Sequence, residues 1–194
     1  MSRYKDLGKI LEKLNDYKVD AEAFKRGNPD YKTWLHSLDM TTRTTFERAL
    51  EAIITVVHDY PVGEHSPFKN TALYIVGSSV TNETYNDIDI ALVGMEEDKI
   101  TDKIIDHFRR YIQHYTCAKN IDVARNTLYS SDYTSYLAAR IKTEDDNEVS
   151  IDFLIDRSGK TIKEWEYQQA ERMERYVSIK RLDEKTKGGL DAFA

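Results

Sequence analysis

Ala72–Val93, ALYIVGSSVTNETYNDIDIALV, is the stretch that decides the fold. It begins with an apolar run that ends at Gly77-Ser78, continues through a polar loop, and enters a second apolar run that contains Asp87 and Asp89. This pattern predicts a strand, a turn and a second strand. Because side chains alternate between the two faces of a strand, the two acids are expected on the same face.

A third acid lies further along the chain, in the strand-like run Glu148–Ile155, EVSIDFLI, which contains Asp152. An unpaired carboxylate inside an apolar strand is costly to bury. Two carboxylates about 5 Å apart repel each other by about 3 kcal/mol at an effective dielectric constant near 20. We therefore expect Asp87, Asp89 and Asp152 to converge within about 5 Å around a cation, and oxygen ligands favour Mg²⁺ or Mn²⁺. The alternative is that the paired acids cap loops and form ion pairs with basic side chains.

In this order, the Gly77-Ser78 turn, the Asp87-x-Asp89 pair and Asp152 resemble the signature of the DNA polymerase β-like nucleotidyltransferase superfamily. The resemblance implies that Gly77 and Ser78 hold the phosphates of a nucleoside triphosphate (NTP). It implies that Asp87 and Asp89 bind the metal ions, and that Asp152 completes the metal site and activates the acceptor. It also implies a palm-like core built on a mixed β-sheet.

The resemblance covers about residues 71–156 and has two departures from the family pattern. The gap between Ser78 and Asp87 is at the short end for the family. Ser79, which we include with the nucleotide-binding residues, stands where many members carry a basic or bulky side chain. Both departures concern the contacts of the loop with the nucleotide rather than the metal site.

Three further side chains are candidates for contacts with the nucleotide. Arg140 and Lys142 share a face of a predicted strand, and Arg140 is the candidate that neutralises nucleotide phosphate. Equally, both basic residues can belong to a surface strand that pairs with Glu148 across a hairpin. Tyr85 lies in the loop before the acids and is a candidate for stacking on a base, or one core tyrosine among 13.

Length and composition limit the classes of protein. The chain has 194 residues, a formal net charge of −6 and a pI near 5.4, so as a whole it is not a basic nucleic-acid binder. Cys117 is the single cysteine, which excludes an internal disulfide framework and fits a reducing compartment. No apolar stretch is long enough to cross a bilayer, and residues 1–25 lack a signal-peptide core. We expect a cytoplasmic protein that does not contact membranes.

The expected fold class is α/β (α+β), a mixed sheet flanked by helices. Predicted helices span Leu7 to Leu14 and beyond, up to Gly27; Tyr31–Leu38; a segment opened by a Thr44-x-x-Glu47 capping box and stopped near Pro61; Ile100–Ile112; and a segment opened by Thr161-x-x-Glu164 and continuing to Ile179. Predicted strands after the motif are Asn120–Leu128, Tyr133–Lys142 and Val149–Ile155, the last two antiparallel. We divide the chain into an N-terminal helical segment packed on the core (1–38), the nucleotidyltransferase core (39–160), and a C-terminal helix with a loose tail (161–194).

The predicted function is transfer of a nucleoside monophosphate (NMP) from an NTP to an acceptor hydroxyl, with release of pyrophosphate. The acceptor is a small molecule, a protein side chain or an RNA end, and the short chain favours the first two. A homo-oligomer or a partner protein is compatible with this prediction. Two alternatives are a non-catalytic nucleotide-binding or interaction module of the same fold, and a sugar-nucleotide glycosyltransferase that uses Asp87-x-Asp89 as its metal motif.

Overall fold

The computed structural model describes residues 20–59, 68, 70–82, 84–94, 102–116, 127–128, 133–142 and 148–181. Its helices are α2 (Ala21–Arg26), α3 (Tyr31–Ser37), α4 (Met40–Asp59), α5 (Ser78–Thr81), α6 (Asp102–Thr116) and α7 (Ile162–Arg172). Its strands are β1 (Ala72–Val76), β2 (Ile88–Val93), β3 (Thr127–Leu128), β4 (Tyr133–Lys142), β5 (Glu148–Asp156) and β6 (Val177–Arg181).

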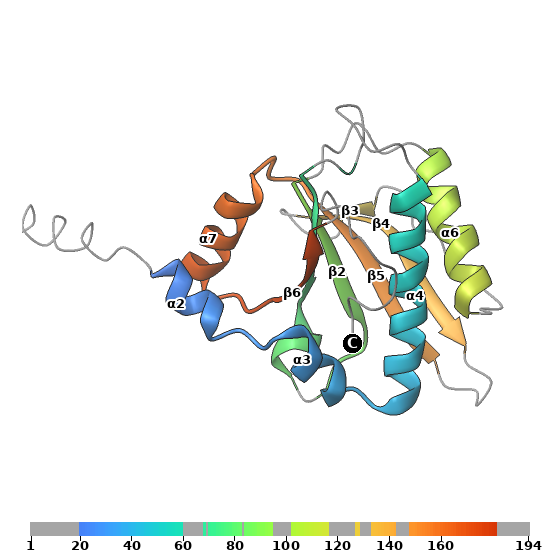
Figure 1. Cartoon of the computed structure of the whole chain (residues 1–194), viewed down its shortest axis with the longest axis horizontal. Coiled ribbons are helices and arrows are strands. Elements are labelled where there is room, and N and C mark those ends of the chain that lie inside the picture. The colour runs from blue at the N-terminus through green and yellow to red at the C-terminus, as the bar shows by residue number, and fades with distance from the viewer. Residues whose placement is uncertain are drawn as a thin grey trace, which may run out of the picture.

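The strands form one six-stranded sheet in the order β3-β4-β5-β2-β1-β6 (Figure 1). Strands β2 and β5 at its centre run parallel, and the other neighbouring pairs are antiparallel. The predicted α/β (α+β) class with a mixed sheet flanked by helices is confirmed. No helix within these residues is long and apolar enough to span a membrane.

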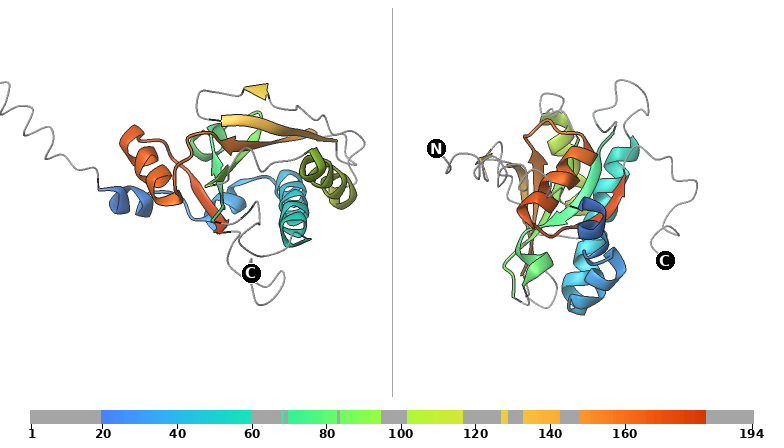
Figure 2. Two further views of the ribbon diagram at one scale, coloured as in Figure 1. Left: turned by 90° about the horizontal axis from the view of Figure 1, so that it is seen from above. Right: turned by 90° about the vertical axis from the view of Figure 1, so that its left-hand side faces the viewer.

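Helices pack on both faces of the sheet. Helices α4 and α6 lie side by side against one face, where the side chains of Ile88 and Ile90 belong to the larger apolar core (Figure 1). The alternate residues of β2, Ala91 and Val93, face the opposite side and pack in a smaller core with Trp165 of α7. Figure 2 shows α7 over only one part of that second face. Strand alternation therefore assigns one face to the main core and the other to α7 and to the acids.

The N-terminal helices agree in part with the prediction. Helix α2 ends at Gly27 as expected, whereas the predicted helix before Asp20 lies outside the described residues. Helix α3 is confirmed, and it buries Trp34 and Leu35. The helix predicted after it also exists as α4.

The predicted capping box at Thr44 is wrong, because α4 begins four residues earlier. The carboxylate of Asp39 accepts a hydrogen bond of 3.0 Å from the backbone N–H of Thr42, the geometry of an N-cap. The hydroxyl of Thr44 instead donates to the carbonyl of Met40 at 2.9 Å within the first turn. Pro61, the predicted stop, lies outside the described residues.

The predicted central elements are present with small shifts. Strands β4 and β5 form the antiparallel pair, with Lys142 opposite Glu148, and helix α6 is confirmed from Asp102 onward. Of the strand predicted over residues 120–128, the structure describes Thr127–Leu128, which form β3. The turn predicted between β4 and β5 lies outside the described residues.

The C-terminal helix is shorter than predicted. Thr161 and Glu164 form the expected capping box, but α7 ends at Arg172, and Met173 adopts a left-handed conformation with φ of 56°. Residues expected to continue the helix form β6, which pairs with β1. The β-branched Val177 and Ile179 alternate with polar residues, a pattern that is typical of a strand. As a strand, β6 pairs with the edge of β1 that β2 leaves open. The predicted loose tail from residue 182 onward lies outside the described residues.

Candidate functional site

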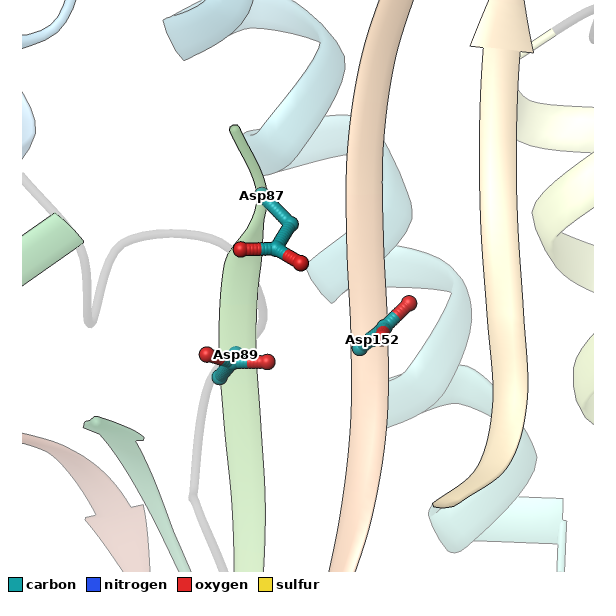
Figure 3. Close-up of side chains that lie close together, drawn as sticks. All are labelled: Asp87, Asp89 and Asp152. Carbon is teal, nitrogen blue, oxygen red and sulfur yellow. The ribbon is translucent and has the colours of Figure 1, made fainter. Parts of the chain in front are cut away.

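Three carboxylates converge where the two parallel strands lie next to each other. Asp89 of β2 and Asp152 of β5 are direct register partners, and Asp87 precedes β2 by one residue. One oxygen from each carboxylate lies within 4.8 Å of the corresponding oxygens of the other two. Figure 3 shows the three side chains, with Asp87 and Asp89 along one strand and Asp152 on its neighbour. The predicted convergence of the acids is confirmed.

The three acids lie on the face of the sheet that also carries α7 and the smaller apolar core. Asp89 is buried, with 3 % of its surface exposed, whereas Asp87 and Asp152 are half-buried. The site is therefore anchored by one buried carboxylate and opens to solvent through the other two. A buried carboxylate flanked by two more acids is an environment that favours a bound cation.

The electrostatics of Asp152 reflect this crowding. Burial raises the pKa of the Asp152 carboxyl above its ordinary value, the negative charge of Asp87 raises it further, and the positive charge of Arg140 opposes both. Arg140 lies on β4, two residues beyond Ala138, which is the register partner of Asp152. Register and strand alternation thus place the exposed Arg140 side chain on the same face as the acids.

The glycine of the Gly-Ser turn lies against the second acid of the pair. Gly77 has a positive φ of 76°, a conformation that other residues rarely adopt. A Cβ atom at this position would overlap the Oδ2 atom of Asp89. The sequence assigned Gly77 to phosphate binding, and the structure adds that its missing side chain leaves room for the buried carboxylate.

The serines after this glycine differ in accessibility. Ser78 is half-buried at the start of α5, and the Ser79 side chain is buried. The backbone carbonyl of Ser79 accepts a hydrogen bond of 2.9 Å from the indole Nε1–H of Trp34 in α3. Sequence reasoning missed Trp34, because an aromatic residue in a short amphipathic helix has the pattern of an ordinary core residue.

The structure also describes the surroundings of two other candidates, Lys142 and Tyr85. Lys142 pairs in register with Glu148, which agrees with the surface-hairpin alternative for that lysine. Tyr85 packs against the larger apolar core on the α4 side. Burial and the negative charge of Asp39 raise the pKa of the Tyr85 hydroxyl. This position favours a packing role for Tyr85.

The donor set fits a hard divalent cation. The cluster consists of three aspartates, and neither histidine nor cysteine belongs to it in the described part of the chain. Carboxylate oxygens are the ligands that Mg²⁺ and Mn²⁺ prefer, whereas zinc sites usually include nitrogen or sulfur ligands. Two oxygens that share one ion with metal–oxygen distances of about 2.0 to 2.6 Å lie at most about 4.0 to 5.2 Å apart, so a separation of 4.8 Å is near the upper end of what one ion can bridge.

Comparisons with known proteins give no relative from which a role can be carried over. The chain matches no family model, no curated protein and no solved structure. Its chemistry must therefore be argued from the carboxylates, the glycine turn and the surroundings of both.

Proposed function

We propose that this protein is a metal-dependent nucleotidyltransferase, which moves an NMP from an NTP to an acceptor hydroxyl and releases pyrophosphate. The observation that carries the proposal is the convergence of Asp87, Asp89 and Asp152 within 4.8 Å, next to a glycine turn packed on one of them. A surface cluster of acids alone would not carry it. Here one acid is almost fully buried and is seated against Gly77.

Under this proposal Asp87, Asp89 and Asp152 hold Mg²⁺ or Mn²⁺. When bound, the metal supplies charge neutralisation at the phosphates and lowers the pKa of a coordinated hydroxyl. The chain itself supplies position. Because Asp89 is fixed by burial and by contact with Gly77, its carboxylate needs little reorganisation.

The remaining residues have distinct parts in this scheme. Gly77, Ser78 and Ser79 form a turn whose amides and Ser78 hydroxyl donate to phosphate oxygens, and Arg140 adds positive charge from the β4 side. The acceptor oxygen bonds to the α-phosphorus while the bond to the β-phosphate oxygen breaks. Asp152 takes the hydroxyl proton, and pyrophosphate leaves with the electron pair of the broken bond.

The acceptor can be identified in one experiment. The protein is incubated with each α-labelled NTP, with Mg²⁺ or Mn²⁺, and with cell extract that is then divided into RNA, protein and metabolites. Label in one fraction identifies the acceptor class, and label from one NTP identifies the base. Label from sugar nucleotides, tested in parallel with a sugar-labelled donor, would support glycosyl transfer instead.

Removing any one carboxylate tests the assignment of the site. Asp87→Asn, Asp89→Asn and Asp152→Asn change charge with little change in volume, so each is expected to lower transfer at least a hundredfold while the fold is kept. The measurements are label transfer and circular dichroism. Glu148→Gln, at the exposed start of β5, is the matched control and should retain activity. Full activity in one of the three variants would remove that residue from the mechanism.

A further inference from the structure

The indole of Trp34 connects the N-terminal helices to the turn that follows β1. Trp34 is buried in α3, with 3 % of its surface exposed, and its Nε1–H donates to the carbonyl of Ser79 at 2.9 Å. The two residues are 45 positions apart in the sequence. The ring is held in place by an edge contact with Phe46 of α4, with ring centroids 5.1 Å apart, and by a tilted contact with Tyr31 at 6.3 Å.

The bonded carbonyl lies within the short helix that contains Ser78 and Ser79. In that helix the backbone N–H of Val80 donates to the carbonyl of Gly77, and that of Asn82 donates to the carbonyl of Ser78. The carbonyl of Ser79, between these two, is fixed by a side chain from outside the turn. A buried carbonyl that lost this donor would leave a polar group unsatisfied, so the turn would shift to find another partner.

We infer that Trp34 is a positioning residue for nucleotide binding, which holds the Gly77–Ser79 turn in place through the Ser79 carbonyl. The inference rests on the proposed function, because it assumes that this turn receives the NTP phosphates. It assigns the segment of α3 a role beyond packing. Asp89 and Asp152 lie on β2 and β5 and Asp87 directly precedes β2, whereas the indole N–H of Trp34 donates to the Ser79 carbonyl in the turn, so metal binding and nucleotide binding should respond differently to its loss.

The second tryptophan of the chain provides a matched control. Trp165 of α7 is equally buried, with 1 % of its surface exposed, and its Nε1–H also donates a hydrogen bond, to the hydroxyl of Tyr133 at 3.3 Å. It packs against Tyr74 and Tyr176 in the smaller core. Trp34→Phe and Trp165→Phe therefore remove similar volume and one indole donor each, but only the first removes a contact with the turn.

The test compares Mn²⁺ affinity and NTP affinity in the full chain. Both are measured by calorimetric titration, the second with each of the four NTPs in saturating Mg²⁺. Trp34→Phe is expected to weaken NTP binding about tenfold and leave Mn²⁺ binding within twofold of the parent. Trp165→Phe should leave both unchanged. Hydrogen exchange of the Val80 and Asn82 amides should accelerate only in Trp34→Phe.

The other possible results distinguish a failure of the positioning role from a failure of the proposed function. Unchanged NTP binding in Trp34→Phe, or equal losses in the two variants, would overturn the positioning role and leave the proposed function standing. A parent that binds Mn²⁺ but no NTP would overturn the proposed function itself, and the inference with it. If Trp34→Phe does not fold, Trp34 is replaced by 3-benzothienylalanine, which keeps the ring size and lacks the N–H, and the same tenfold loss is required.

Discussion

Gly77 lies against Asp89, although a polar loop separates the two residues in the sequence. Its positive φ turns the chain after β1, and its lack of a side chain admits the Oδ2 atom of Asp89. With φ of 76° and ψ of −157°, its backbone lies in a region that is essentially restricted to glycine, so any other residue would meet both backbone strain and the buried carboxylate. At the scale of single residues, the glycine turn and the candidate metal site are therefore one structure.

A comparison of two glycines tests this coupling. Gly77→Ala should destabilise the protein by about 1 to 2 kcal/mol through backbone strain, and it should also weaken Mn²⁺ binding at least tenfold by displacing Asp89. Gly159 also has a positive φ, of 63°, but a Cβ there would meet no atom within 4 Å. Gly159→Ala should thus lose similar stability without losing metal affinity. Denaturant unfolding and Mn²⁺ titration measure the two quantities. Equal Mn²⁺ affinity in both variants would contradict the coupling.

Residue patterns in the sequence predict some of these features better than others. Alternation along one strand is enough to place Asp87 and Asp89 on one face, because the period of a strand is local. The contact between Trp34 and Ser79 could not be predicted in this way. It depends on how α3 packs on the turn after β1, and a single sequence carries no periodic signal for that packing.

Among the helices and strands, too, the sequence predicts features that depend on local periodicity better than features that depend on pairing with a distant segment. Strands β4 and β5 match their predicted ranges almost to the residue, since both sequences alternate and a polar sequence, residues 143–147, stands between them. Strand β6 was predicted as helix, because Tyr176 and Ile179 also fit a helical spacing after α7. Its pairing with the distant β1 decides in favour of a strand. Local periodicity predicts an element only where tertiary pairing does not compete.

The start of α4 provides a prediction at this scale. Asp39→Ala should lower the free energy of unfolding by about 1 kcal/mol at pH 7, because it removes the side-chain acceptor at the N-cap. Thr44→Ala should change it by less than about 0.5 kcal/mol, since its hydroxyl only donates back to the helix. Chemical denaturation of parent and variants measures both.

The effect of Asp39 should also depend on pH. Hydrogen bonds from Thr42 lower the pKa of the Asp39 carboxyl below its ordinary value of 3.8. The native state then binds fewer protons than the unfolded state in the interval between the two pKa values, so the contribution is complete above the unfolded value. It should be lost as pH falls through the native one. A difference between parent and Asp39→Ala that grows on acidification would contradict this N-cap assignment.

At the scale of the whole molecule, the sheet separates the larger apolar core from the three acids of the candidate site. The face covered by α4 and α6 holds the larger apolar core, and α7 packs on the opposite face (Figure 2). Strand alternation places the three acids on that opposite face as well. Like charges within 4.8 Å destabilise the protein when no cation is present. The apolar cores must offset this repulsion. A cation that binds only the folded state should relieve the repulsion and raise the free energy of unfolding.

Thermal unfolding should therefore depend on metal and nucleotide together. Mg²⁺ should raise the melting temperature of the parent. An NTP added with Mg²⁺ should raise it further, because at a hundredfold excess over its dissociation constant it adds about 2.7 kcal/mol to the free energy of unfolding. In a chelator, Asp87→Asn should be at least as stable as the parent, because one of the repelling charges is gone. It should gain little from Mg²⁺ and NTP, since a ligand of the metal is lost. A thermal-shift series on parent and variant measures the three conditions, which are chelator, Mg²⁺, and Mg²⁺ with NTP. Equal metal-dependent gains in parent and variant would place the cation elsewhere, and the proposal of nucleotidyl transfer would lose its main physical support.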